Sequence, residues 1–94
     1  MSDKIYKTFE KDPDGKLDYQ NNWELEISPD TITESTWESE DGGLTLSDEA
    51  NTDYTATVTV AGGNDGESHV AANHIVRASG LEDTRRIRFN ICKQ

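Results

Sequence analysis

The sequence predicts an all-β protein, in which about seven short and mostly antiparallel strands form a small sandwich. Three runs in the second half of the chain alternate apolar and polar residues, at residues 55–61, 68–77 and 85–92. This two-residue period is typical of strands with one buried and one solvent-facing side. Clusters of Gly, Asp, Asn and Ser between the runs indicate turns. Strands are expected to start near residues 5, 23, 31, 44, 54, 69 and 85.

The N-terminal segment is predicted to be either a first strand or an arm that lies on a neighbouring subunit. It is rich in β-forming residues and ends at a strong turn signal, Asp-Pro-Asp-Gly at residues 12–15. Aromatic side chains are favoured anchors in protein interfaces, and Tyr6 and Phe9 precede this turn. We therefore expect Ile5, Tyr6 and Phe9 to be protein-interface residues within an arm or strand at residues 1–10.

The middle of the chain is expected to supply two tryptophans to the core. Trp23, Leu25 and Ile27 alternate with glutamates, which predicts a half-buried strand. Ile32 and Trp37 are an odd number of residues apart, so one strand can bury both only if a β-bulge intervenes. A short strand with Leu44 and Leu46 follows, and residues 47–52 are expected to form a polar connection with a single helical turn.

The alternation in the last three runs predicts which side chains are buried. The expected core positions are Ala56, Val58 and Val60, then Val70, Ala72, His74 and Val76, then Ile87, Phe89 and Ile91. His74 is accordingly expected at the edge of the core. His69 would point to the opposite face, so the two imidazoles cannot hold one metal ion from a regular strand. The linkers at residues 62–66 and 79–83 have the composition of hairpin turns.

The number and spacing of the strands favour an immunoglobulin-like sandwich, with a small β-barrel as the alternative. The length of 94 residues indicates a single domain over residues 1–94. Cys92 is the single cysteine, so no internal disulfide is possible and the Cys pair of antibody domains is absent.

Charge is distributed unevenly along the chain. Residues 1–54 hold 15 of the 19 acidic residues and 4 of the 9 basic ones, which gives a net charge of −11. No Lys or Arg occurs between Leu17 and Val76, so a nucleic-acid partner is not expected. The cluster of Arg77, Arg85, Arg86 and Arg88 is expected to neutralise acidic groups within the fold or on a neighbour. A signal peptide and a membrane-spanning run are not apparent, so no membrane partner is expected.

No catalytic, cofactor or metal site is predicted. Asp12, Asp14 and Asp18 superficially resemble a calcium loop, but the distal glutamate and the helical flanks of such a loop are missing. The chain has no activated-nucleophile motif, and a small sandwich has little room for a substrate pocket. These observations favour a binding or assembly module over an enzyme.

Six segments, in this order and spacing, resemble a group of small tailed-bacteriophage proteins. The segments are K-D-P-D-G-K-L-D-Y at 11–19 followed by Trp23, D-T-I-T-E-S-T-W at 30–37, G-L-T-L at 43–46, T-A-T-V-T-V-A-G-G at 55–63, G-E-S-H-V-A-A-N-H-I-V at 66–76, and R-R-I-R-F-N-I at 85–91. The acidic stretch at 39–43 departs from the apolar turn that is usual there, which alters the charge of the surface.

The resemblance implies a virion structural protein that works by docking and carries no catalytic residue. Such proteins include adaptors that join fibres to the tail. We therefore expect a fibre–tail adaptor, assembled in the bacterial host cytoplasm and present in several copies beside other tail, fibre or capsid proteins. One alternative is a capsid decoration or cement protein. Another is a carbohydrate-binding module, which would need Trp23 and Trp37 exposed on one face.

Overall fold

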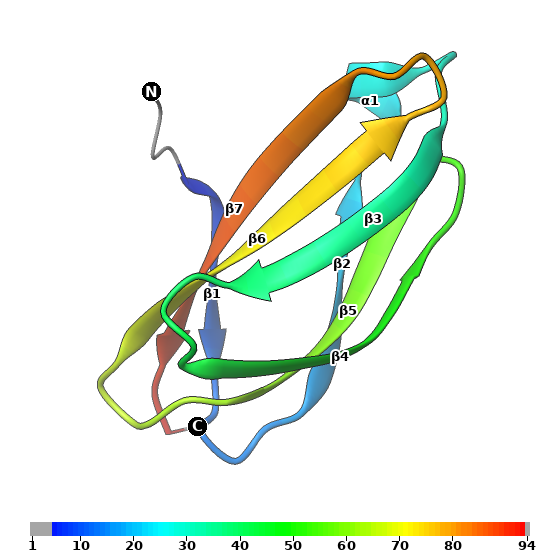
Figure 1. Cartoon of the computed structure of the whole chain (residues 1–94). Coiled ribbons are helices and arrows are strands. Elements are labelled where there is room, and N and C mark those ends of the chain that lie inside the picture. Colours follow the sequence, from blue (N-terminus) through cyan, green and yellow to red (C-terminus); the bar gives the residue numbers. More distant parts are fainter. Residues whose placement is uncertain (1–4, 94) are drawn as a thin grey trace.

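A computed structural model describes residues 5–93, which form two facing β-sheets (Figure 1). The strand order is β1-β7-β6-β3 in the first sheet and β2-β5-β4 in the second. The elements are β1 (Ile5–Lys11), β2 (Leu17–Asn22), α1 (Glu24–Ile27), β3 (Ile32–Ser39), β4 (Leu44–Asn51), β5 (Thr55–Gly62), β6 (Ser68–Arg77) and β7 (Glu82–Ile91). The predicted all-β sandwich is confirmed.

The N-terminal segment forms the edge strand β1 of the first sheet. It pairs with β7 in parallel, with Phe9 opposite Phe89 and Lys11 opposite Ile91, whereas the other strand pairs are antiparallel. Of the segment at residues 1–10 proposed as a strand or an arm, residues 5–10 thus belong to a strand within this chain, which ends at Lys11. Residues 1–4 lie outside the described part.

The core lies between the sheets and contains both tryptophans, as predicted. Trp23 is 2% exposed and Trp37 is 7% exposed. The rings of Phe9, Tyr19 and Phe89 all contact one another, and the Tyr19 centroid lies 5.1 Å from that of Phe9 and 4.8 Å from that of Phe89. The other buried apolar residues are Ile27, Ile32, Leu44, Ala56, Val58, Val60, Ala71, Ile75, Ile87 and Ile91.

The β-bulge that would let Ile32 and Trp37 share a face is present in β3. The pairing of β3 with β6 shifts register between Ile32 and Glu34. The extra residue reverses the side-chain alternation once. Ile32 and Trp37 can therefore both enter the core despite their odd separation.

The buried face of β6 is the opposite of the predicted one. The strand buries His69, Ala71, Asn73 and Ile75, while the predicted core positions Val70, Ala72, His74 and Val76 are only half-buried. Directly paired residues share one face of a sheet. Because His69 pairs with Phe89 and Ala71 pairs with Ile87, the partner strand β7 sets the face. Each side of β6 carries apolar residues, so hydrophobicity alone could not decide between them.

The predicted strand around Leu25 is a short helix, and the predicted helical turn at residues 47–52 belongs to a strand. Trp23 and Ile27 are four residues apart, which places them on one side of a helical turn. Leu25 then points outward and is 98% exposed. The strand in this part of the chain is β2, which ends just before the helix. In β4 the strand continues to Asn51 across a register shift, with Asp48 at φ 51°.

Only one of the two expected hairpins occurs. Residues 79–83 do join the antiparallel neighbours β6 and β7. Residues 62–66 instead cross from one sheet to the other, since β5 and β6 belong to different sheets. This crossing passes close to β7: a Cβ on Gly63 would come within 2.8 Å of Ile91.

A buried carboxamide connects the two sheets through the core. The Asn73 side chain is 0% exposed, and its oxygen accepts hydrogen bonds from Asn21 Nδ2 at 3.1 Å and Trp23 Nε1 at 3.0 Å. Its amide nitrogen donates to Ser35 Oγ and to the Thr36 carbonyl, both at 3.0 Å. All four hydrogen bonds that an asparagine side chain can form are therefore made.

We expect Asn73→Leu to destabilise the protein by about 3 kcal/mol or more, because it leaves two buried donors without an acceptor at roughly 1–3 kcal/mol each. Urea unfolding followed by tryptophan fluorescence measures this change. Asn90→Leu, at an exposed position of β7, is the matched control and should change stability by no more than about 0.5 kcal/mol. Equal stability of the two variants would contradict a structural role for the carboxamide.

Candidate functional site

The molecule has two polar regions, one at each end of the sandwich. The turn after β1, the turn between β3 and β4, and the crossing from β5 to β6 lie at one end, which we call the loop end. Helix α1 and the hairpin between β6 and β7 lie at the other end, which we call the helix end (Figure 1). The principal extents of the fold are 41, 29 and 20 Å.

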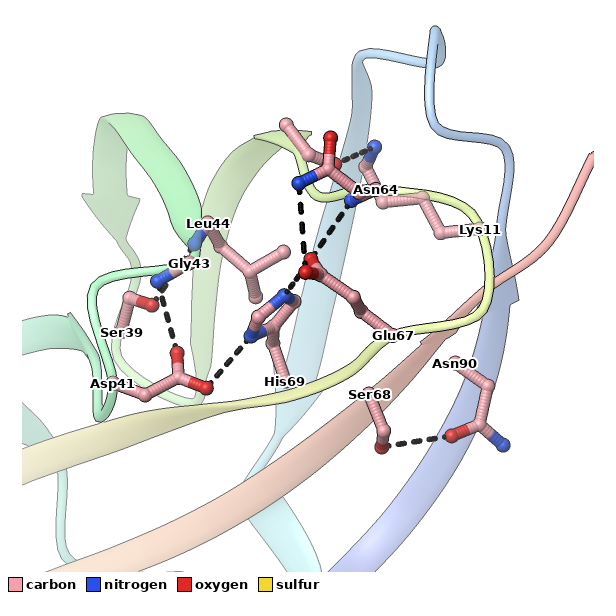
Figure 2. A network of polar contacts seen from close by, with 11 residues as sticks. Lys11, Ser39, Asp41, Gly43, Leu44, Asn64, Glu67, Ser68, His69 and Asn90 are labelled. Carbon is pink, nitrogen blue, oxygen red and sulfur yellow. Dashed lines mark hydrogen bonds and ion pairs between the residues drawn. The ribbon is translucent and has the colours of Figure 1, made fainter.

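His69 holds together two connections at the loop end. Its Nδ1 is 2.7 Å from Asp41 Oδ2 in the turn after β3, and its Nε2 is 2.8 Å from Glu67 Oε1 in the crossing from β5 (Figure 2). Asp41 also accepts the Gly43 backbone N–H at 2.9 Å, and Glu67 accepts that of Asn64 at 3.0 Å. The side chain of His69 is 11% exposed. We call these two carboxylates and the imidazole the histidine clamp.

The clamp favours the charged form of each of its three groups. Hydrogen bonds to Asp41 and then Glu67 raise the pKa of His69 above its usual 6.5, against an opposing effect of burial. The His69 hydrogen bond is in turn the largest cause that lowers the pKa of Asp41 and of Glu67. The backbone of Gly43 packs directly against the imidazole ring of His69. A Cβ at residue 43 would come within 2.1 Å of His69 Cε1.

Lys11 is a second buried cation at the loop end. It is 1% exposed, and its Nζ donates to the Gly62 carbonyl at 2.7 Å and to the Asp12 carbonyl at 2.9 Å. Burial lowers the pKa of its amine, while the charges of Asp12 and Asp14 raise it. The ammonium group thereby joins the end of β1 to the end of β5, which lies in the opposite sheet.

At the helix end, Arg85 is enclosed by two aromatic rings. Its Cζ lies 4.0 Å from the ring centroids of Tyr6 and of Trp23. Its Nη1 donates to the Asn22 carbonyl and its Nη2 to Glu26 Oε1, both at 2.8 Å. Arg85 is 6% exposed and therefore part of the fold rather than an open anion site.

Two of the neighbouring arginines, Arg77 and Arg86, also pair with acids inside the molecule, in line with the neutralising role expected for the cluster. Arg77 Nε lies 3.3 Å from Asp83 Oδ2 and 3.9 Å from Asp30 Oδ2. Arg86 Nε lies 2.9 Å from Glu40 Oε2. These contacts bring the basic cluster of β6 and β7 against the acidic first half of the chain.

The three residues predicted for an interface differ in their surroundings. Tyr6 is 53% exposed and covers Arg85. Phe9 points between the sheets, where its ring centroid is 5.8 Å from that of Phe89. Ile5 is half-buried at the start of β1.

The polar residues considered at the sequence level do not converge on one site. Asp12 accepts the backbone N–H of Asp14 in the turn, whereas Asp18 accepts a hydrogen bond from Thr59 on β5. His74 is not at the core edge: it lies on the outer face, 42% exposed, between Thr84 and Glu82. Within residues 5–93 no three His, Cys, Asp or Glu side chains are arranged to hold a metal ion.

Sequence reasoning missed Lys11 and Arg85, although their positions carried a signal. Lys11 is two residues from Phe9 in β1, and Arg85 is two residues from Ile87 in β7. The two-residue alternation therefore placed both side chains on inner faces.

Within the described part of the chain, no helix has the length and apolar character that crossing a bilayer requires.

Comparison with known proteins identifies the family. The model of one family, described as the podophage GP4 fiber-tail adaptor protein gp77, matches residues 11–90. The chain belongs to this family. The gp77 family consists of phage structural adaptors, so the resemblance seen in the sequence is confirmed and the chain is a virion component. Among curated proteins, no sequence matches the chain significantly.

Solved structures support the fold assignment. The PKD domain of the KIAA 1837 protein superposes with a TM-score of 0.63 at 16% identity, over 99% of this gp77-family chain and 85% of the domain. A 2,6-sialyltransferase from Photobacterium sp. JT-ISH-224 gives a TM-score of 0.61 at 17% identity, over 98% of this chain. The chain spans only 19% of that enzyme, so the likeness concerns the fold. An immunoglobulin-like sandwich is confirmed.

The histidine clamp should make stability depend on pH through His69. Because the pKa of His69 is raised in the folded state, the imidazole stabilises the fold below about pH 6.5. This stabilisation is lost as the pH rises through the pKa of His69 in the folded protein. The pKa values of Asp41 and Glu67 are lowered, so their contributions are present above their usual 3.8 and 4.5 and are lost as the pH falls. All three contribute between roughly pH 5 and 6.5.

We expect the difference in unfolding free energy between the wild type and His69→Gln to be largest in this window and to shrink toward pH 9 and pH 3. Urea titrations across the pH series measure it. Thr8→Ala, at an exposed position of β1, is the control and should differ from the wild type by the same small amount at each pH. A difference for His69→Gln that does not vary with pH would contradict the clamp.

Proposed function

We propose that this chain is a non-enzymatic fibre–tail adaptor of a podophage virion, which docks between tail and fibre proteins. The family match over residues 11–90 carries the proposal. In this proposal the protein is assembled in the host cytoplasm and occupies several equivalent positions in the particle. Its partners are other phage structural proteins, without nucleic acid or membrane. The absence of Lys and Arg between Leu17 and Val76 supports the exclusion of nucleic acid.

The edge strand β1 is the part of the sandwich that we propose for docking through backbone hydrogen bonds. Edge strands offer unpaired N–H and C=O groups that a neighbouring chain can bind. At the opposite edge, Glu49 of β4 accepts the Trp37 backbone N–H of β3 at 3.0 Å, which occupies one edge donor. Tyr6 lies on β1 with half of its surface exposed, which suits an aromatic interface anchor.

The carbohydrate-binding alternative required Trp23 and Trp37 to be exposed on one face of the sandwich. Sugars are expected to stack on exposed aromatic rings, but Trp23 and Trp37 are both buried in the core. The capsid decoration alternative uses the same fold and the same strand edges, so the position in the particle separates it from an adaptor.

An electron cryo-microscopy map of the intact particle tests the proposed function. We expect density for this chain between the tail and a fibre, because an adaptor must contact both. Density on the capsid lattice would identify a decoration protein instead. A particle that lacks the chain altogether would refute both structural roles.

We expect Tyr6→Ala to reduce incorporation into particles by about tenfold, since truncating an aromatic interface anchor often costs more than 1 kcal/mol of binding free energy. Quantitative immunoblotting of purified particles measures incorporation, and tryptophan fluorescence checks that the variant folds. Thr8→Ala on the same strand should be incorporated normally. Normal incorporation of a folded Tyr6→Ala variant would remove β1 from the docking surface.

A further inference from the structure

Two of the large exposed apolar side chains belong to elements at the helix end, and a third is connected to them through Arg85. Residues 5–93 expose four large hydrophobic side chains: Tyr6 at 53%, Leu17 at 57%, Leu25 at 98% and Leu81 at 58%. Leu25 belongs to α1 and Leu81 to the hairpin before β7, which lie at the same end of the sandwich (Figure 1). Tyr6 stacks on Arg85, which in turn binds α1. Two of the four thus come from elements at the helix end, and a third, Tyr6, is connected to α1 through Arg85.

Two arginines fix these three elements relative to one another. Glu26 of α1 receives a hydrogen bond from Arg85 on its carboxylate at 2.8 Å and one from Arg77 on its backbone carbonyl at 3.1 Å. Arg77 begins the hairpin, and its backbone N–H donates to the Leu81 carbonyl at 2.8 Å. The spacing between Tyr6, Leu25 and Leu81 is therefore set by the fold.

Helix α1 presents Leu25 in a fixed position. Trp23 and Ile27 on either side are 2% and 3% exposed and anchor the turn in the core. The Asn22 side chain accepts the Glu24 N–H at 2.9 Å, which further restrains the chain where it enters the helix. A side chain that is held in place before binding loses little conformational freedom when a partner covers it.

The exposed charge around Leu25 is negative. Glu24 is exposed, Glu26 and Glu82 expose 55% and 57% of their side chains, and Asp83 exposes 41%. Among the basic side chains near this end, Arg77 and Arg85 lie in ion pairs with exposures of only 15% and 6%, and His74 pairs with Glu82 at 42% exposure. The surface therefore consists of an apolar centre with an acidic border.

We infer that this end of the sandwich is a docking surface whose central contact is Leu25, and that it fits an apolar pocket bordered by Lys and Arg side chains on another virion protein. The inference rests on the proposed adaptor function and assigns it a surface and a partner chemistry. Charge complementarity favours such a pocket over a second copy of the same end, because two acidic borders would repel each other.

The test measures binding of the purified chain to phage particles that were assembled without it. We expect Leu25→Ala to bind about 10- to 100-fold more weakly, as the loss of one buried leucine implies, and Leu25→Asp more weakly still. Glu24→Lys should also weaken binding, and added salt should weaken the binding of the wild type. Leu17→Ala and Leu17→Asp are matched controls at an exposed leucine of β2, and both should bind like the wild type.

The outcomes separate the inference from the function on which it rests. If the wild type does not bind the particles, the proposed adaptor function fails. If the wild type binds and folded Leu25 variants bind equally well, the docking surface is overturned while the function stands. Because Leu25 is 98% exposed, its variants should unfold at the same temperature as the wild type, which thermal unfolding verifies. Leu25-dependent self-association without particle binding would also overturn the inference.

Discussion

The fold depends on one fully buried polar group, the carboxamide of Asn73. It lies among apolar side chains on β6 and binds β2, the residue that precedes α1, and β3 at once. A buried amide is costly unless every donor and acceptor is satisfied, and any slip of one strand would break several of these bonds together. The carboxamide therefore fixes how the two sheets face each other, and apolar packing alone would permit other registers. The position of Trp23, and with it the start of α1, follows from the same group.

The acidic composition is compatible with a compact fold because cations from the second half of the chain reach the acids of the first. Arg85 and Arg77 both bind Glu26 of α1 at the helix end, and His69 binds Asp41 at the loop end. These contacts join elements that are far apart in sequence, so the charge imbalance along the chain becomes a set of cross-links in space. What remains unneutralised is exposed acid, which makes copies of the chain repel one another and favours partners of opposite charge.

Local alternation was sufficient to predict the class of fold, most strands and both core tryptophans, and it showed that burying both Ile32 and Trp37 would require a bulge in β3. It failed where apolar residues occur on both sides of a strand, as in β6, because the choice of face there is made by the register with β7 and by the Asn73 hydrogen bonds. It also failed at α1, where an apolar spacing of four residues fits a helical turn as well as a strand. Nothing in the local pattern indicated that His69 would meet two carboxylates, since Asp41 is 28 positions away and reaches it only through a turn between sheets.

The contact between Gly43 and His69 limits how sequences of this family can vary. No side chain fits at residue 43 while an imidazole occupies the space beside it. A relative with a larger residue at position 43 would need a smaller residue at position 69, a reoriented imidazole or a displaced turn after β3. We therefore expect these two positions, 26 residues apart in the sequence, to vary together among relatives that keep this turn.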